Sequence, residues 1–177
     1  TKTQSSKLMV HKVLISLGSN LGDRALSITK AISFIQDKLG DVIAISELYE
    51  TDSWGYDDHA YLNNAICLIT KFAPLDLMNE LLEIELKLGR KRSESKHYQA
   101  RTIDIDILLI EGMVIHHSKL NVPHPRMNFR RFVLQPLTDI APDWVHEVEG
   151  VSVSDLLLKC EDQIDVNLYG KIPLHSR

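Results

Sequence analysis

Apolar side chains recur along this chain at two different spacings, and these spacings outline its elements. Short continuous runs such as Val13 to Leu17 are typical of strands buried on both faces. Apolar positions three or four apart, such as Ile28, Ile32 and Ile35, indicate a helix that packs one face on a core. On this basis we predict strands at 13–17, 42–49, 62–72 and 101–110, and helices at 25–39, 73–88 and 152–160.

The main elements follow the order strand, helix, strand, strand, helix, strand. This βαββαβ order is that of a split βαβ, or ferredoxin-like, fold, so we expect an α+β protein. It predicts an antiparallel sheet with both helices on one face and the other face open for loops and ligands. Residues 120–137, which carry three prolines, are expected to be irregular. We expect residues 1–10 to form a flexible arm and residues 11–177 a single domain.

The composition is that of an ordinary globular protein. The 177 residues are 44% apolar and 25% charged, and the formal net charge of -4 disfavours general binding to polyanions such as nucleic acids. Two cysteines are too few for a disulfide framework, and the polar residues 1–12 lack the apolar stretch of a signal peptide. No segment approaches the roughly 20 apolar residues that cross a membrane. We therefore expect a cytoplasmic protein without membrane or nucleic-acid partners.

Two aspartates lie on the clearest strand pattern of the chain, at 101–110. Asp104 and Asp106 share one face of this strand, while the intervening isoleucines share the other. Same-face neighbours are about 7 Å apart along the backbone, so the two carboxylates can converge on one or two hard cations such as Mg²⁺. A solvated polar face on an edge strand would show the same alternation, because Asp-x-Asp alone is a weak motif.

Basic residues beside this strand favour the cation interpretation. Residues 89–100 carry several basic side chains, and an acidic pair beside them suits a magnesium nucleotide, because acids hold the metal and bases contact phosphate oxygens. His124 lies between two prolines that fix its position, although a structural turn would have the same sequence. Glu85 falls near the apolar face of its helix. It either reaches to solvent or pairs with a ligand or an arginine.

Tyr61 and Asn63 share a face at the start of the third predicted strand. A ring beside an amide suits a flat heterocycle, because the ring stacks and the amide offers a paired donor and acceptor. Phe132, next to Arg130 and Arg131, is a second candidate wall of such a pocket. Each of these residues also has a simple structural interpretation, as a strand end, a turn amide or a core ring.

Several segments, taken together, resemble one family of enzymes. They are SLGSNLGDR at 16–24, Thr51 with Trp54-Gly55, YLNN at 61–64, IELKLGRKR at 84–92, RTIDIDILL at 101–109, VPHP at 122–125 and RRFVLQPL at 130–137. In this order they are similar to the 6-hydroxymethyl-7,8-dihydropterin pyrophosphokinases of folate biosynthesis, over about residues 11–158. The resemblance implies a ferredoxin-like fold, two Mg²⁺ ions, and transfer of a diphosphoryl group from ATP to the pterin hydroxymethyl group, leaving AMP.

The resemblance also implies roles for individual residues. Asp104 and Asp106 match the metal ligands, and Arg90 and Arg92 match basic residues of a mobile segment that closes over the site. The pterin site is implied at Thr51, Trp54, Tyr61, Asn63 and Phe132. ATP contacts are implied at Glu85, Arg101, Ile107, Lys119, Asn121, His124 and Arg130. We expect a monomer whose partners are ATP and the pterin.

A few positions depart from the family pattern. Asp52 and Ser53 stand where prolines often follow the threonine, and Lys119 stands where an arginine is frequent, so a bidentate phosphate contact becomes a point charge. Either Lys96 or His97 replaces an arginine of the basic segment. Two other functions compete with this one. An RNA-binding sheet would need surface aromatics, and a metal-dependent phosphohydrolase would need a third carboxylate or a histidine cluster.

Overall fold

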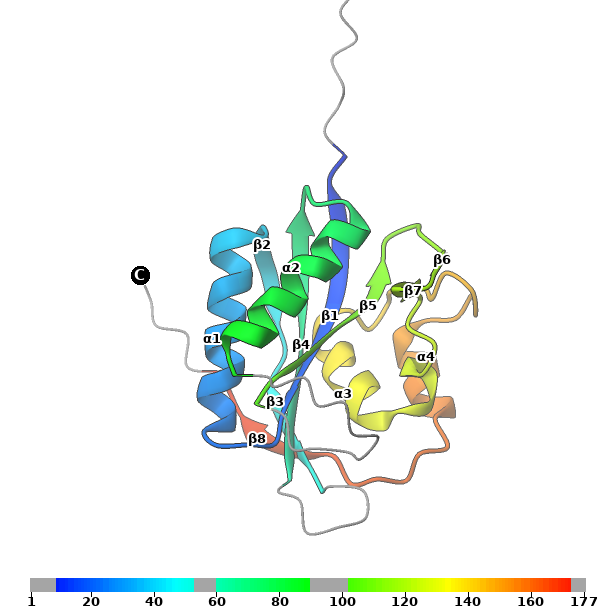
Figure 1. The fold of residues 1–177 in the computed structure, drawn as a ribbon. Coiled ribbons are helices and arrows are strands. Elements are labelled where there is room, and N and C mark those ends of the chain that lie inside the picture. The colour runs from blue at the N-terminus through cyan, green and yellow to red at the C-terminus, as the bar shows by residue number, and fades with distance from the viewer. Residues whose placement is uncertain (1–8, 53–59, 90–101, 173–177) are drawn as a thin grey trace, which may run out of the picture.

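The computed structural model describes residues 9–52, 60–89 and 102–172. There the chain forms a six-stranded antiparallel sheet, a small hairpin, and helices on both faces of the sheet (Figure 1). The strands are β1 (His11–Ser19), β2 (Asp41–Ile45), β3 (Leu48–Thr51), β4 (Tyr61–Thr70), β5 (Asp104–Ile110), β6 (Ile115–His117), β7 (Leu120–Val122) and β8 (Asn167–Gly170). The helices are α1 (Arg24–Lys38), α2 (Pro74–Lys87), α3 (Arg131–Ile140) and α4 (Val153–Lys159), with a 3-10 turn η1 (Met127–Phe129). No helix in these three ranges is long and apolar enough to cross a membrane.

The strands lie in the order β5-β1-β4-β3-β8, and β2 also pairs with β4. β1 pairs antiparallel with β4 on one side and with β5 on the other. Val13, Leu14 and Ile15 in β1 are fully buried, which confirms the prediction of a strand covered on both faces. The order of β1, α1, β2 with β3, β4, α2 and β5 also confirms the predicted α+β, ferredoxin-like arrangement.

The strand predicted at 42–49 is in fact two strands, β2 and β3, so the prediction of one continuous strand was wrong. The break lies at Ser46 and Glu47, between two segments that both pair with β4. Ala65 N–H donates to the Ser46 hydroxyl at 2.8 Å, and Ser46 N–H donates to the Ala65 carbonyl at 2.9 Å. Because the hydroxyl replaces a main-chain acceptor, the chain bends here without leaving a buried N–H unsatisfied.

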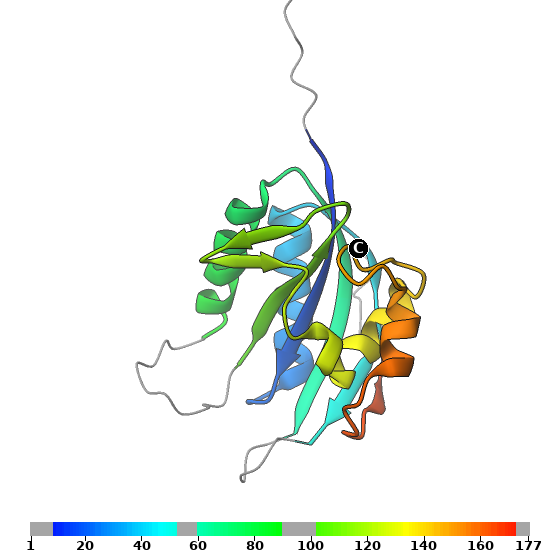
Figure 2. The same cartoon turned by 90° about the vertical axis from the view of Figure 1, so that its right-hand side faces the viewer.

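α1 and α2 cover one face of the sheet, as the helical spacing predicts (Figure 2). α1 buries Ile28, Ile32 and Ile35 in a core cluster that also contains alternate residues of β1 and β5. The helix begins after Asp23, whose carboxylate accepts a hydrogen bond from the Leu26 N–H at 3.0 Å. This N-cap satisfies one of the amides that an α-helix leaves unpaired at its start.

The opposite face of the sheet carries α3 and α4, as well as the loops expected there (Figure 2). Leu134 and Leu137 of α3 join Leu14 of β1 and Cys67 of β4 in a second core cluster. Residues 120–137 were predicted to be irregular, and this prediction was wrong, because they contain β7, η1 and most of α3. The second face is therefore partly covered by α3 and α4 rather than open along its whole length.

Pro136 explains why α3 was missed. It lies inside the helix, where a proline removes one hydrogen bond and costs about 3 kcal/mol. Its neighbours Val133, Leu134 and Leu137 are all buried, and each fully buried apolar side chain contributes about 1.5–3 kcal/mol. The burial of the apolar face therefore outweighs the proline.

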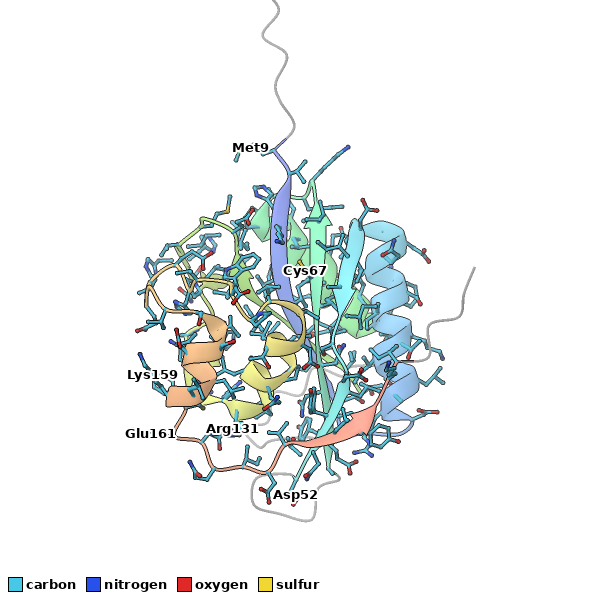
Figure 3. All side chains as sticks on the ribbon, turned by 180° about the vertical axis from the view of Figure 1, so that it is seen from behind. Met9, Asp52, Cys67, Arg131, Lys159 and Glu161 are labelled. Carbon is cyan, nitrogen blue, oxygen red and sulfur yellow. The ribbon has the colours of Figure 1, made fainter. Side chains whose placement is uncertain are left out.

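The helix predicted at 152–160 is confirmed as α4, which begins after Ser152. The Ser152 hydroxyl accepts from the Asp155 N–H at 3.1 Å. After α4 the chain runs back to the sheet, where β8 pairs with the outer edge of β3 (Figure 3). Ile172, which follows β8, is 8% exposed and belongs to the first core cluster. The sequence analysis did not predict this added edge strand.

Candidate functional site

One end of the sheet brings together the predicted amide and acidic residues. Because neighbouring strands are antiparallel, β1 and β3 end where β4 and β5 begin. Asn63, Gly18 and Asp104 are direct partners across β4, β1 and β5, and Asp106 faces Ser16 one step further along. Direct partners lie on the same face of a sheet. The amide and both carboxylates therefore share the face opposite α1 and α2.

Gly18 forms the floor between the amide and the acidic strand. A β-carbon at this position would lie 3.3 Å from Asn63 Oδ1 and 4.0 Å from Tyr61 Cδ1. The first distance is tighter than ordinary packing allows, so a glycine here keeps the space above β1 open for the neighbouring side chains. The predicted strand ended at Leu17, and the position of Gly18 inside β1 appears only with the strand register.

Asp104 and Asp106 are half-buried, whereas Ile105 between them is 2% exposed and lies in the core beneath α1 and α2. The predicted alternation is confirmed. Within the described ranges there is no group of three or more His, Cys, Asp or Glu side chains that could hold a metal. A pair of carboxylates fits Mg²⁺, which keeps waters and takes other ligands from substrate phosphates. The same pair does not provide the closed tetrahedral set that structural zinc requires.

Glu85 of α2 holds the backbone of the acidic strand. Its side chain is 1% exposed, and its Oε1 accepts from the Ile105 N–H at 2.7 Å. The side chain is buried rather than reaching to solvent, and its partner here is a main-chain amide. Pairing with a ligand or an arginine stays a prediction. Because Ile105 stands between the two aspartates, this bond fixes the strand at the point where both carboxylates leave it. An ATP contact at Glu85 stays a prediction.

Three of the predicted pterin-site residues meet at the ends of β3 and β4. Thr51 and Tyr61 are direct partners, and Asn63 follows on the same face. The Asn63 amide nitrogen donates to the Thr51 hydroxyl at 3.0 Å, and both side chains are buried. Tyr61 is half-buried beside them. The hydrogen bond fixes the plane of the amide, which is what recognition of a flat heterocycle requires.

Phe132, the second predicted ring, lies at the start of α3 and follows Arg130 and Arg131. Phe132 is half-buried against the second core cluster, and the Arg130 guanidinium carbon lies 5.7 Å from its ring centroid. Arg131 is occupied differently: its Nε donates to the Asp162 carbonyl at 2.9 Å, and its main-chain N–H donates to the Asp162 carboxylate at 3.0 Å. Arg131 therefore fixes the C-terminal segment, whereas Arg130 stays beside the site.

His124 lies next to the outer edge of β5. Its N–H donates to the Leu108 carbonyl at 2.8 Å, and its Nδ1 accepts from the Arg126 N–H at 3.2 Å. Burial, followed by the Arg130 and Arg126 charges, lowers the pKa of His124 below its usual value, and the Asp104 charge opposes this shift. The imidazole is therefore neutral at neutral pH, and with Nδ1 as an acceptor it carries its proton on Nε2. It can donate to a phosphate oxygen.

The structure does not place the remaining predicted side chains on this face. Ile107 is 2% exposed in the first core cluster, so its side chain points away from the carboxylates and a contact with ATP would involve its main chain. Lys119 and Asn121 are exposed on the β6–β7 hairpin. Trp54, Arg90, Arg92, Arg101 and both candidates for the replaced arginine, Lys96 and His97, lie outside the described residues.

A contact that the sequence analysis missed links α3 to the sheet beside the site. Tyr49 is the direct partner of Asn63, and its hydroxyl donates to the Asp139 carboxylate at 2.9 Å. Burial and then the Asp139 carboxylate raise the pKa of Tyr49 to about 12. Asp139 also accepts from the Glu47 N–H at 3.1 Å. No periodicity connects residues so far apart in sequence, so only the folded chain reveals this pair.

Comparison with known sequences gives a consistent result. Residues 14–142 match the model of the 7,8-dihydro-6-hydroxymethylpterin-pyrophosphokinase family. The chain is 40% identical over 137 residues to a 2-amino-4-hydroxy-6-hydroxymethyldihydropteridine pyrophosphokinase of Porphyromonas gingivalis, covering 76% of this chain and 92% of that protein. It is 42% identical over 128 residues to the protein of that name from Bacillus subtilis, covering 71% and 75%. The matched range contains all of the candidate site residues.

Comparison with solved structures supports the fold. A crystal structure of Plasmodium falciparum HPPK-DHPS with STZ-DHP superimposes with a TM-score of 0.70 at 17% sequence identity, covering 85% of this chain and 43% of that chain. At that identity the similarity concerns the arrangement of helices and strands rather than individual residues.

Proposed function

Because this chain belongs to the 7,8-dihydro-6-hydroxymethylpterin-pyrophosphokinase family, we propose that it transfers a diphosphoryl group from ATP to the hydroxymethyl group of 6-hydroxymethyl-7,8-dihydropterin. The products are AMP and the pterin diphosphate, an intermediate of folate biosynthesis. The observation that carries this proposal is the row of Asn63, Gly18 and Asp104 across three neighbouring strands. Strands lie about 4.8 Å apart, so roughly 10 Å separates the amide strand from the acidic strand. That spacing accommodates a bicyclic ring and its hydroxymethyl arm.

The pterin is proposed to bind at the Asn63 end of this row. Tyr61 and Phe132 would stack on its two faces, and the Asn63 amide would pair with its polar edge. Thr51 supports this role because it holds the Asn63 amide in one plane. Trp54 is proposed to complete the pocket. The buried surroundings strengthen each hydrogen bond, because water does not compete for the amide.

The nucleotide is proposed to bind at the acidic end of the row, with Mg²⁺. Asp104 and Asp106 would hold the metal, which when bound would neutralise the charge on the phosphates, and the family resemblance implies two such ions. The neutral His124 and the charged Arg130 would contact phosphate oxygens from the side of α3. Further ATP contacts are proposed at Glu85, Arg101, Ile107, Lys119 and Asn121. Arg90 and Arg92 are proposed to act on the phosphates from the basic segment.

The reaction is a substitution at the β-phosphorus of ATP. The pterin hydroxyl oxygen forms the new bond, the bond from that phosphorus to the α,β-bridging oxygen breaks, and AMP leaves with the bridging oxygen while the hydroxyl proton passes to solvent. The protein contributes by holding the two substrates in line and by placing positive charge on the phosphates. We propose that the protein acts as a monomer.

The product of the reaction tests the proposal directly. The protein is incubated with ATP, Mg²⁺ and the reduced hydroxymethylpterin, and nucleotide products are separated by chromatography. We expect AMP in equal amount to the pterin diphosphate and little AMP without the pterin. Orthophosphate and ADP released at the same rate without the pterin would identify a phosphohydrolase and refute the proposal. Replacing Mg²⁺ with a chelator should abolish the formation of AMP.

A further inference from the structure

Arg24, the last residue of the SLGSNLGDR segment, has no role in the function described so far. It is the first residue of α1, and its side chain reaches the ends of two strands at the pterin side of the site. Its Nη1 donates to the Ala60 carbonyl at 2.6 Å, and its Nη2 lies 2.6 Å from the Glu50 carboxylate. The side chain is 21% exposed, so these contacts are only partly screened by water.

The two partners of Arg24 stand immediately beside pocket residues. Glu50 precedes Thr51 at the end of β3, and Ala60 precedes Tyr61 at the start of β4. Thr51 and Tyr61 are themselves direct partners in the sheet. One guanidinium therefore joins the strand end that carries the Thr51 hydroxyl to the strand start that carries the Tyr61 ring. These two ends flank residues 53–59 in the sequence.

A third contact comes from the C-terminal strand. The Arg24 guanidinium carbon lies 5.8 Å from the ring centroid of Tyr169 in β8, a distance at which a cation and a ring attract. β8 pairs with β3, with Asn167 opposite Glu50 and Leu168 opposite Tyr49. It lies beyond residue 142, where the match to the family model ends. The chain thus adds an element outside the family match that packs on the residue linking the two strand ends.

We propose that Arg24 is a positioning residue for the pterin pocket, held in place by Tyr169. This proposal rests on the proposed function, because it takes Tyr61, Asn63 and Thr51 as the pterin site. Arg24 does not touch the pterin; it sets the separation of the β3 end and the β4 start, and hence the position of the Tyr61 ring relative to the Asn63 amide. A planar guanidinium is needed, because one group must bind a carbonyl and a carboxylate at once, and a lysine ammonium does not reproduce this fork.

The proposal is tested by measuring two affinities separately. Titration calorimetry gives the Kd of 6-hydroxymethylpterin in the presence of a non-hydrolysable ATP analogue and Mg²⁺, and the Kd of the analogue alone. Arg24→Met removes both the bond to Ala60 and the ion pair with Glu50. We expect the pterin Kd to rise about tenfold as the two strand ends lose their link, while the analogue Kd changes less than about twofold. Arg24→Lys should lie between this variant and the wild type.

Two further variants separate positioning from folding. Glu50→Gln keeps a polar partner and should raise the pterin Kd only about twofold to threefold, as should Tyr169→Leu, which removes the ring above the guanidinium. Lys30→Met, an exposed cation elsewhere on α1, is the matched control and should leave both affinities unchanged.

An unchanged pterin Kd in Arg24→Met, or a rise of both Kd values together with a lower melting temperature, would overturn the positioning role in favour of a purely structural one. Failure of the wild type to bind the pterin at all would instead refute the proposed function on which this inference depends.

Discussion

The two faces of the central sheet have different roles, although the same strands form both. Towards α1 and α2, β5 presents Ile105 and Ile107, which are buried in a continuous apolar core. Towards α3, the same strand presents Asp104 and Asp106, in one row with Asn63 of β4. A step of one residue along β5 thus crosses from the core to the site.

This difference shows how a small fold combines stability with chemistry. The face beneath α1 and α2 contributes apolar burial, which is tolerant of small changes in shape but sensitive to lost volume. The other face buries little apolar surface at its open end. The side chains there are polar or charged and are suited to binding. We therefore expect substitutions on the first face to change the free energy of unfolding, and substitutions on the second to change binding and turnover.

The largest effect should come from the acidic pair. Asp104→Ala or Asp106→Ala should lower turnover on the order of a thousandfold, because each removes a carboxylate that would hold Mg²⁺ at the phosphates. The pterin Kd and the melting temperature should change little. Steady-state kinetics with AMP detection measures the first, and calorimetry the others. Asp41→Ala, at an exposed site on β2, is the control. Full activity in either acidic variant would refute the assignment.

Tyr61→Ala tests the pterin end of the same face. Loss of one stacking ring should cost about 1–3 kcal/mol of binding, or roughly a tenfold to hundredfold rise in the pterin Kd. The affinity for an ATP analogue should be retained. Phe129→Ala removes an exposed ring close to the start of α3 and should leave both affinities unchanged. Equal weakening of ATP and pterin binding by Tyr61→Ala would argue against a separate pterin pocket.

Glu85 connects the two faces, so substitutions at this residue test whether the two faces are independent. It reaches from the helix side, yet it holds the backbone between the two aspartates. Glu85→Leu leaves the Ile105 N–H without this acceptor and should cost about 1–3 kcal/mol of unfolding free energy while weakening Mn²⁺ binding. Glu85→Gln keeps an acceptor and should do less of both. Denaturant unfolding and electron paramagnetic resonance of Mn²⁺ measure the two effects. Identical losses in both variants would show that the charge, rather than the hydrogen bond, is what matters.

Tyr49→Phe should cost about 1–2 kcal/mol by removing the hydroxyl that binds Asp139. The pKa of Tyr49 is raised from 10.0 to about 12 in the folded chain. Its contribution to stability is therefore present below pH 10 and is lost as the pH rises towards 12. Unfolding measured across that range should show a steeper loss in the wild type than in Tyr49→Phe. Parallel curves would contradict this coupling.

Ile105→Val should have the smallest effect. Removing one buried methylene should cost about 0.5–1.5 kcal/mol of unfolding free energy and leave turnover nearly unchanged. Because Ile105 stands between the two aspartates, a large loss of activity without loss of stability would show that the two faces are not independent.

The fold was largely predictable where one periodicity dominates. The isoleucines of β5 and the apolar stripe of α1 follow their expected spacing, and both lie in the core. α3 was missed because Pro136 looks like a helix breaker, although Val133, Leu134 and Leu137 stand at helical spacing. Burial of these side chains in the second core cluster offsets the cost of the proline. β8 was missed although Ile164, Val166 and Leu168 alternate with polar residues in the sequence. Its side chains are largely exposed, and pairing with β3 defines it.

The site was predictable where alternation and motif agree. Asp104 and Asp106 were placed on one face from the period-two pattern, and the structure puts Asn63 on that same face. The role of Gly18 and the bond from Glu85 to the Ile105 amide could not be predicted, because both depend on strand register and helix packing. These are distances between residues remote in sequence, which the spacing of side chains does not encode.

The outer edge of β5 has a consequence for how copies of this protein meet. An uncovered strand edge offers unpaired amides and carbonyls that can recruit a strand from another molecule, which leads to aggregation. Here the Ile105 amide is occupied by Glu85 and the Leu108 carbonyl by the His124 amide, although among the described residues no strand lies beyond β5. At the opposite edge, β8 is only four residues long and is followed by Lys171. The residues that hold the acidic strand in place thus also keep that edge from pairing with a neighbour.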